Sequence, residues 1–188
     1  MIILLALLDD VPIMTIAYDR TPLPSRPVRW RMRRLLLESG FMGLLSIVQT
    51  FGLLIIGMEW VSNAQWQAWI TLTQEHLQTI IFLQLVAGGH LLLLVVRSRG
   101  AFYSRPWPAR PLLFAVLGTQ LVAVLMCGFG WVVTAIPWTV IALVWVYMII
   151  WMLALDLAKR LIHRRLAGDT RDGFAGARVS SRPWRRRR

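Results

Sequence analysis

Residues 111–155 read PLLFAVLGTQLVAVLMCGFGWVVTAIPWTVIALVWVYMIIWMLAL, and this stretch contains no Asp, Glu, Lys or Arg. A helix needs about 20 mostly apolar residues to cross the hydrocarbon core of a bilayer, so the stretch is too long for one crossing. Gly128, Gly130 and Pro137 interrupt it, and such residues are typical of turns. The stretch therefore predicts two membrane helices, at residues 111–135 and 138–158, joined as a hairpin.

Three further apolar runs precede this hairpin, at residues 1–17, 35–58 and 77–96. The first run is short, and Asp9 and Asp10 lie in its middle. The whole chain is 57% hydrophobic and 16% charged, whereas a soluble domain is about 45–50% apolar and about 25% charged. The sequence thus predicts an all-α protein, a helical transmembrane bundle of about five spans with the first one truncated. The bundle forms a single domain at residues 1–163.

The basic residues are distributed unevenly along the chain. All 21 Lys and Arg residues lie in three polar segments, namely between the first and second runs, between the third and fourth, and after the last. By the positive-inside rule these segments face the cytoplasm. The net charge of +12 is therefore interpreted as a topology signal, and we expect no nucleic-acid partner.

Two of the polar segments have their own compositional signals. Residues 164–188 are rich in Arg, Gly and Ser, and we expect a disordered cytoplasmic tail there. Its four final arginines could bind anionic lipid head groups, although setting the topology is the simpler role. The segment at residues 18–34 contains Pro22, Pro24 and Pro27, which predict an extended loop.

The candidate ion site lies in the first run, at Asp9 and Asp10. An ionisable residue at membrane depth costs roughly 2.5–3.5 kcal/mol to insert, which makes it a functional hypothesis by default. Two adjacent carboxylates repel each other in a low dielectric, so one of them is suited to taking up and releasing a proton. In the alternative interpretation, residues 1–8 form an outer tail and the acid pair lies at the membrane interface.

Pro12 follows the acid pair directly. Proline has no N–H, so the carbonyl of Leu8 loses its helical partner, and the ring disfavours a regular turn. We therefore expect a kinked or unwound helix with Pro12 as its hinge. An unwound turn beside a carboxylate is a feature of ion sites in carrier proteins.

This segment resembles the sixth transmembrane helix of P-type ATPases of the plasma-membrane, proton-exporting type. Those pumps carry a Leu-(Asn/Asp)-Asp-x-x-Ile-Met-Thr-Ile-x-x-Asp stretch, which is matched here from Leu8 to Asp19. A looser similarity continues through the Arg-Ser-Arg and Arg-Pro segments at residues 97–106 to Asp156 and Lys159. The resemblance covers about residues 1–163 and implies the C-terminal five spans of a pump in the plasma membrane.

The resemblance implies that Asp10 carries the transported proton. Asp9 stands where the family usually has Asn, so the chain has two acids in place of one and the identity of the ion is less certain. The Asp-Lys-Thr-Gly phosphorylation motif of the family is not found in the chain, nor is a Gly-rich phosphate loop. We therefore expect no catalytic residue and no cofactor in this chain, with ATP and Mg²⁺ acting in the complete pump.

Two other functions remain open at this point. The chain could be a non-enzymatic membrane subunit or packing partner, or part of a pump for another cation. A small independent carrier is a third alternative. In each case the expected partners are the lipid bilayer and, for a pump, its remaining helices and cytoplasmic domains.

The remaining polar side chains of the spans are expected to be structural. The three histidines are not at metal-ligand spacing, so we predict no metal site. Glu38 is expected to pair with Arg33 or Arg34, and Asp156 to lie at the interface beside Lys159 and Arg160. The candidates for hydrogen bonds between helices are Gln49, Gln84 and Gln120.

Overall fold

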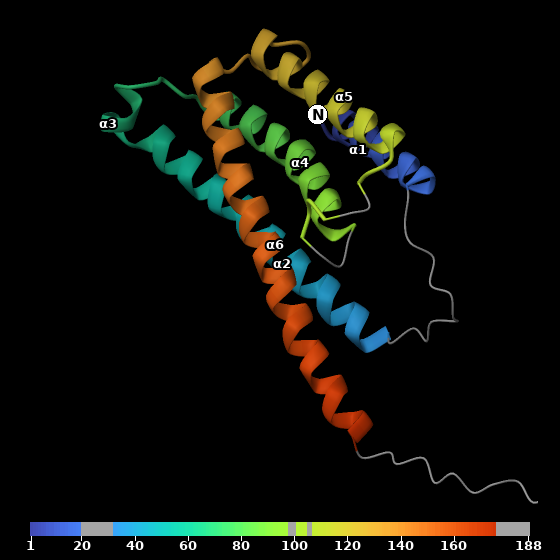
Figure 1. Ribbon diagram of the computed structural model, residues 1–188. Helices are drawn as coiled ribbons and strands as arrows, with labels where there is room; N and C mark the ends of the chain where they lie inside the picture. Colours follow the sequence, from blue (N-terminus) through green and yellow to red (C-terminus); the bar gives the residue numbers. More distant parts are fainter. Residues whose placement is uncertain (20–31, 98–100, 105–106, 176–188) are drawn as a thin grey trace, which may run out of the picture.

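The computed structural model describes residues 1–19, 32–97, 101–104 and 107–175, and the elements in these ranges are helices (Figure 1). Four of these helices are long and apolar enough to cross a membrane by length and composition. The predicted all-α membrane bundle is thus confirmed. In chain order the elements are α1 (Ile2–Thr15), the 3₁₀ turn η1 (Ile16–Tyr18), α2 (Met32–Ser62), α3 (Ala64–Gln67), α4 (Gln74–Val96), α5 (Arg110–Phe129) and α6 (Trp138–Ala175).

The predicted hairpin is present as α5 and α6, but α5 ends earlier than expected. Gly130 closes α5 in the left-handed conformation, with φ of 75°, and its N–H donates to the Met126 carbonyl. Glycine adopts this conformation without the steric penalty of a Cβ atom. The predicted end at residue 135 was wrong because the residues after Gly130 are apolar without being helical. The Ile136 N–H then donates to the Cys127 carbonyl at 2.9 Å, which folds the turn back onto α5.

Helices α2, α4 and α6 extend beyond the apolar runs that predicted them. α4 begins at Gln74 because Thr73 and His76 form a capping box, which also gives His76 a structural role. α6 continues to Ala175, whereas the sequence led us to expect disorder from residue 164. A formed helix propagates with one hydrogen bond per added residue, so hydropathy does not mark its end. Residues 176–188, and residues 20–31 of the predicted extended loop, lie outside the described residues.

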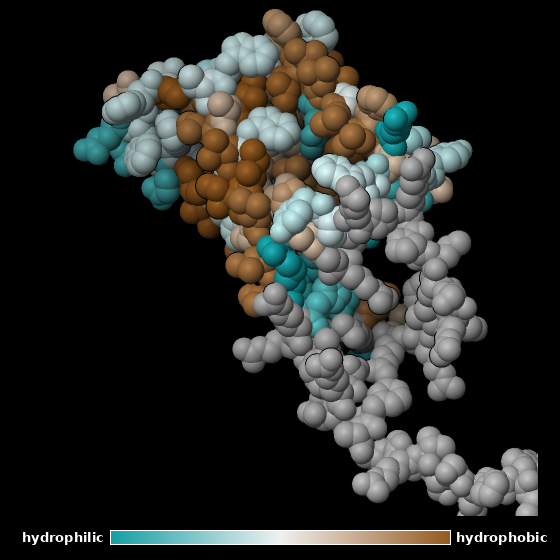
Figure 2. Space-filling view, in the orientation of Figure 1, coloured by the Kyte–Doolittle hydropathy of each residue, from teal (hydrophilic) through white to brown (hydrophobic). Residues whose placement is uncertain are grey.

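Helix α4 is the centre of the bundle. It packs against α1, α2, α5 and α6, and its residues Leu83, Val86 and Ala87 are completely buried. Many apolar side chains on the outward faces of the helices are exposed, and Figure 2 shows them covering much of the visible surface. Such all-round hydrophobicity is expected for helices in a lipid environment.

Polar side chains join the helices inside the bundle. Gln84 of α4 donates to the Thr50 hydroxyl of α2 at 3.3 Å, which confirms its predicted role. Gln49 is buried, and its backbone carbonyl accepts a hydrogen bond of 2.6 Å from the Tyr147 hydroxyl of α6. Gln120 is buried as well, but its Nε2 has no hydrogen-bond partner among the described residues, so the predicted bond from this side chain is not present.

Helix α1 runs without a break through Pro12, so the predicted unwound turn is not present. The helix instead changes to the 3₁₀ turn η1 at Ile16. Just before this change, the side-chain hydroxyl of Thr15 donates to the Pro12 carbonyl at 2.8 Å. Leu8 and Pro12 are the buried residues of α1. Packing of this face on α4 and α5 compensates for the hydrogen bond that proline removes.

Candidate ion-translocation site

Asp9 and Asp10 are neighbours in α1, but they lie on different faces of it. Successive residues of an α-helix are rotated by about 100°. The side chain of Asp9 is 34% exposed and turns towards α4, whereas Asp10 is exposed. The structure therefore separates the two acids that the sequence grouped as one pair.

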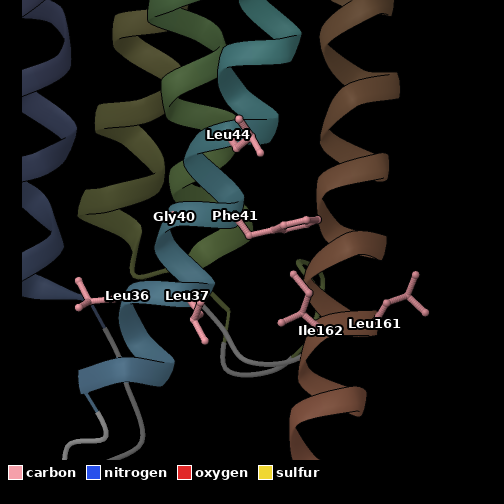
Figure 3. Close-up of a pocket in the computed structure, with 7 residues that line it drawn as sticks. All are labelled: Leu36, Leu37, Gly40, Phe41, Leu44, Leu161 and Ile162. Carbon is pink, nitrogen blue, oxygen red and sulfur yellow. The ribbon is translucent and has the colours of Figure 1, made fainter.

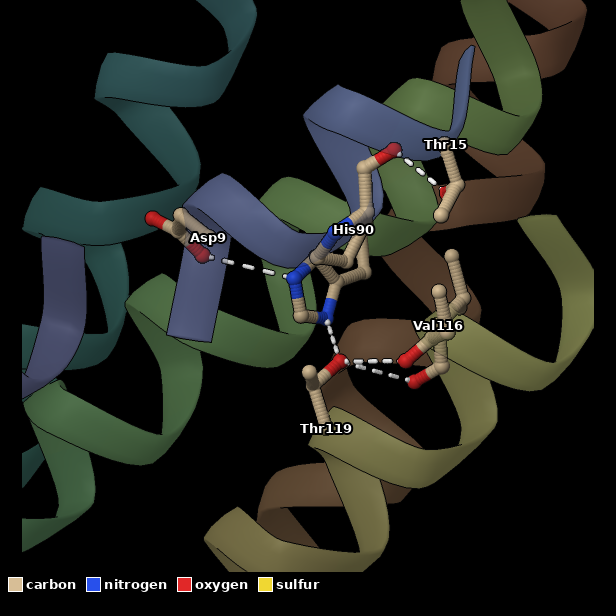
Figure 4. A network of polar contacts seen from close by, with 7 residues as sticks. Asp9, Thr15, His90, Val116 and Thr119 are labelled. Carbon is tan, nitrogen blue, oxygen red and sulfur yellow. Dashed lines mark hydrogen bonds and ion pairs between the residues drawn. The ribbon is translucent and has the colours of Figure 1, made fainter. Parts of the chain in front are cut away.

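The partner of Asp9 is His90 of α4 (Figure 4). Asp9 Oδ1 lies 3.4 Å from His90 Nε2, and the histidine side chain is only 3% exposed. Both atoms are buried, and neither has a hydrogen bond of normal geometry within the described ranges. A buried carboxylate oxygen and a buried ring nitrogen thus face each other. This contact is favourable only when one of the two atoms carries a hydrogen that points at the other.

The other ring nitrogen of His90 faces helix α5. Its Nδ1 lies 3.5 Å from the hydroxyl of Thr119. That hydroxyl donates to the carbonyls of Ala115, at 2.8 Å, and Val116, at 3.1 Å, within its own helix. The contacts of His90 with Asp9 and Thr119 therefore connect α1, α4 and α5 through side chains.

Pro12 contributes to this network through the backbone of α1. Because proline has no N–H, the Leu8 carbonyl has no helical donor. This carbonyl lies close to the His90 imidazole, which is a polar neighbour for it in the apolar interior. Pro12 therefore has a structural consequence at the acid site although the helix is continuous there.

Asp10 belongs to an otherwise apolar surface, which we call the open face of α1. It consists of Ile3, Leu7, Asp10 and Met14, which follow one another at helical spacing and are all exposed. A carboxylate in an apolar environment needs polar neighbours. The exposed position of Asp10 leaves its carboxylate accessible to groups outside the described bundle.

The end of the matched segment is held by an ion pair that sequence reasoning missed. Arg97, which ends α4, pairs through Nε with Asp19 Oδ2, and both side chains are largely buried. The N–H of Ala109, which caps α5, donates to Asp19 Oδ1 at 2.9 Å. Asp19 thus connects the end of η1 with the adjacent ends of α4 and α5.

A second buried acid, Asp156, holds α6. It pairs with Lys159 and Arg160, each at 3.1 Å, and accepts from the Phe102 N–H at 3.0 Å. The predicted pairing is confirmed, and Asp156 is 1% exposed. Its location at the membrane interface stays a prediction. Lys159 donates to the Val95 carbonyl at 2.7 Å, so this cluster closes the end of α4 against α6.

The remaining predicted polar group is Glu38 of α2. His163 of α6 lies 3.4 Å from its carboxylate, a partner that the sequence did not predict. Beside this contact, a cavity of about 570 Å³ opens between α2 and α6 (Figure 3). Its lining is apolar and offers no ligand for an ion: Leu36, Leu37, Gly40, Phe41, Leu44, Leu161 and Ile162.

Within the described ranges no three His, Cys, Asp or Glu residues lie close enough together to hold a metal. Sequence reasoning gave His90 a purely structural role and missed its contact with Asp9. A signal was available, because a histidine in an apolar span needs a polar partner.

Comparison with known proteins gives similarity to ion pumps over most of the chain. A cation-transporting ATPase of Methanocaldococcus jannaschii is 35% identical over 90% of the chain, which covers 20% of that protein. Plasma membrane ATPase 2 of Schizosaccharomyces pombe is 28% identical over 79% of the chain, and the matched region makes up 14% of that protein.

A third relative extends the range of organisms. A protein of Leishmania donovani named as a proton ATPase is 27% identical over 87% of the chain, and 19% of its length is covered. No protein-family model matches the chain. The chain thus spans a fifth or less of the length of these relatives.

Proposed function

This chain corresponds to a C-terminal membrane region of the P-type cation-transporting ATPases, and from that premise we propose that it is part of a proton-exporting pump. In this proposal Asp10 carries the transported proton. The relative of Leishmania donovani that is named as a proton ATPase supports a proton over another cation.

The observation that carries the proposal is the exposure of Asp10 on the open face of α1. The buried acids Asp19 and Asp156 have basic partners within the bundle, Arg97 and Lys159 respectively. Asp10 instead lies beside Ile3, Leu7 and Met14. We infer that other membrane helices of the pump cover this face and complete the path of the proton around Asp10.

The chemistry of ATP is assigned to the rest of the pump. The chain contains neither the phosphorylation motif nor a phosphate loop, so ATP and Mg²⁺ would act in domains outside it. We propose that this segment supplies a carboxylate of the path and the helices that support it. The segment alone would not hydrolyse ATP.

The proposed location is the plasma membrane, with the basic loops and the C-terminus in the cytoplasm. The orientation follows from the restriction of Lys and Arg to three polar segments. The arginines at residues 185–188 lie outside the described residues, and we propose that they attract anionic lipid head groups.

The test uses a full-length ATPase in which these 188 residues form the C-terminal region, reconstituted in liposomes. ATP-driven acidification is measured for the wild type, Asp10→Asn, and the control Glu59→Gln, which removes an exposed acid from α2. We expect Asp10→Asn to lower proton transport by at least about 100-fold, because the carrier group itself is lost. Glu59→Gln should transport normally.

Two outcomes would overturn the proposal. The first is normal proton transport by Asp10→Asn. The second is a wild-type protein that moves Na⁺, K⁺ or Ca²⁺ without acidification, which would assign the segment to a pump for another cation. Flux through the 188-residue chain without ATP would instead support an independent carrier.

A further inference from the structure

We propose that Asp9 and His90 together bind one proton inside the bundle, at a site separate from Asp10. The proton is shared between Asp9 Oδ1 and His90 Nε2, and Thr119 orients the imidazole. The existence of this site does not depend on the proposed function, but its importance for pumping rests on it.

The Thr119 hydroxyl determines whether Nδ1 of His90 carries a hydrogen. The Thr119 hydroxyl has one hydrogen, which it donates to the Ala115 and Val116 carbonyls at 2.8 and 3.1 Å. Towards His90 it can therefore only accept. The contact of 3.5 Å between Nδ1 and this hydroxyl thus assigns a hydrogen to Nδ1.

The other ring nitrogen of His90, Nε2, faces hydrogen-bond acceptors. Asp9 Oδ1 lies 3.4 Å away, and the Leu8 carbonyl lies close to the same ring. A neutral imidazole carries only one hydrogen, and Nδ1 already holds it. Nε2 would then direct a lone pair at a carboxylate, and two buried acceptors facing each other are unfavourable.

One additional proton removes this conflict. On Nε2 it gives an imidazolium beside a carboxylate, and on Oδ1 it gives a carboxylic acid that donates to the ring. In both forms the pair is electrically neutral, whereas without the proton it is a net negative charge in an apolar bundle. The geometry of the described residues therefore fits the proton-bound pair.

The surroundings provide a route for this proton. The Asp9 side chain is 34% exposed, whereas His90 is enclosed, so exchange takes place through Asp9. Asp10 on α1 is the adjacent titratable group, and α5 contributes Thr119, which does not titrate. Without the proton, two acceptors, Asp9 Oδ1 of α1 and His90 Nε2 of α4, face each other. Binding of the proton therefore favours the packing of α1 on α4.

The test is nitrogen-15 NMR of the 188-residue chain in lipid nanodiscs, with labelled histidine. The signals are assigned with His76→Gln and His163→Gln variants. We expect His90 to keep a hydrogen on Nδ1 across the pH range and to show a titration step at Nε2. In Asp9→Asn this step should shift by more than one pH unit, because the carboxylate partner is lost.

Matched controls separate the pair from general effects. Asp10→Asn alters the adjacent acid and should leave the titration step at Nε2 in place. Thr119→Val removes the acceptor beside Nδ1, so the hydrogen should no longer be fixed on Nδ1. Thr79→Val replaces another buried threonine of the bundle, whose hydroxyl bonds within α4, and should leave both ring signals unchanged. Retained helical circular dichroism shows that each variant is folded.

The proposal is overturned if His90 carries its hydrogen on Nε2, with a bare Nδ1, at every pH. It is also overturned if Asp9→Asn leaves the Nε2 titration in place. These results are independent of transport. If the Asp10→Asn pump is inactive but the NMR result contradicts the shared proton, only this inference is overturned. If the NMR result is as expected but the Asp10→Asn pump transports protons normally, only the proposed function is overturned.

Discussion

At the scale of single residues, three acids of the described bundle differ in their partners. Asp9 faces an imidazole, Asp10 lies on an open apolar face, and Asp156 is enclosed by two cations and a backbone N–H. An enclosed charge with several partners is a structural group, because removing one partner leaves another buried and uncompensated. The exposed carboxylate of Asp10 is the group that we propose for transport.

Asp156→Leu is expected to destabilise the bundle by about 3 kcal/mol, because it leaves Lys159 buried without its carboxylate. Unfolding of the chain in mixed micelles by increasing SDS measures the change. Glu75→Gln, at an exposed acid in the first turn of α4, is the control and should change stability by less than about 0.5 kcal/mol. Equal stability of the two variants would contradict a structural role for Asp156.

At the scale of elements, α1 is the unusual helix. It is only 14 residues long, and it contains a proline without losing its helical course. Its C-terminal end is held from outside, since Asp19 after η1 binds Arg97 and the Ala109 N–H. Packing on α4 and α5 therefore stabilises a helix that would be marginal by itself. The role of Pro12 as a hinge stays a prediction.

Pro12→Ala is expected to restore the hydrogen bond to the Leu8 carbonyl, which contributes about 1 kcal/mol. Hydrogen–deuterium exchange should then slow at the amides of α1, and the His90 ring should lose a polar neighbour. If Pro12 is a hinge, proton transport by the full-length pump falls as well. Unchanged exchange in α1 would show that the Leu8 carbonyl is already satisfied.

Gly118→Ala is the control for the change in helix propensity. Gly118 is exposed on α5, and a Cβ atom there meets nothing within 4 Å. The variant should stabilise α5 by about 0.5–1 kcal/mol without slowing exchange in α1.

At the scale of the whole molecule, the bundle is organised around α4. Every other long helix packs against it, and its middle turns are completely enclosed. The outward faces are largely apolar, as lipid requires, and the open face of α1 carries the exposed carboxylate of Asp10. The bundle is therefore complete around α4 and open at α1.

Ala87→Leu is expected to destabilise the bundle by about 1–3 kcal/mol, because the position is fully enclosed and a larger side chain overpacks it. Ala142→Leu makes the same change at an exposed position of α6 and should be neutral within about 0.5 kcal/mol. Unfolding by SDS compares the two. Equal effects would contradict the central position of α4.

The sequence by itself determined the class of fold, the hairpin at residues 111–155 and the location of the acid pair. These features follow from local composition, since uncharged runs, glycine and proline act on their own segment. Helix ends were predicted less well, because caps and hydrogen bonds place them and hydropathy does not.

Only the tertiary structure decided which side chains meet. The contact of Asp9 with His90 joins residues 81 positions apart, and no spacing rule in a single sequence gives such a distance. The same holds for Asp19 with Arg97, and for the burial of Asp156. Packing of α1 on α4 turned one acid inward and left Asp10 outward, because adjacent residues of a helix cannot share a face.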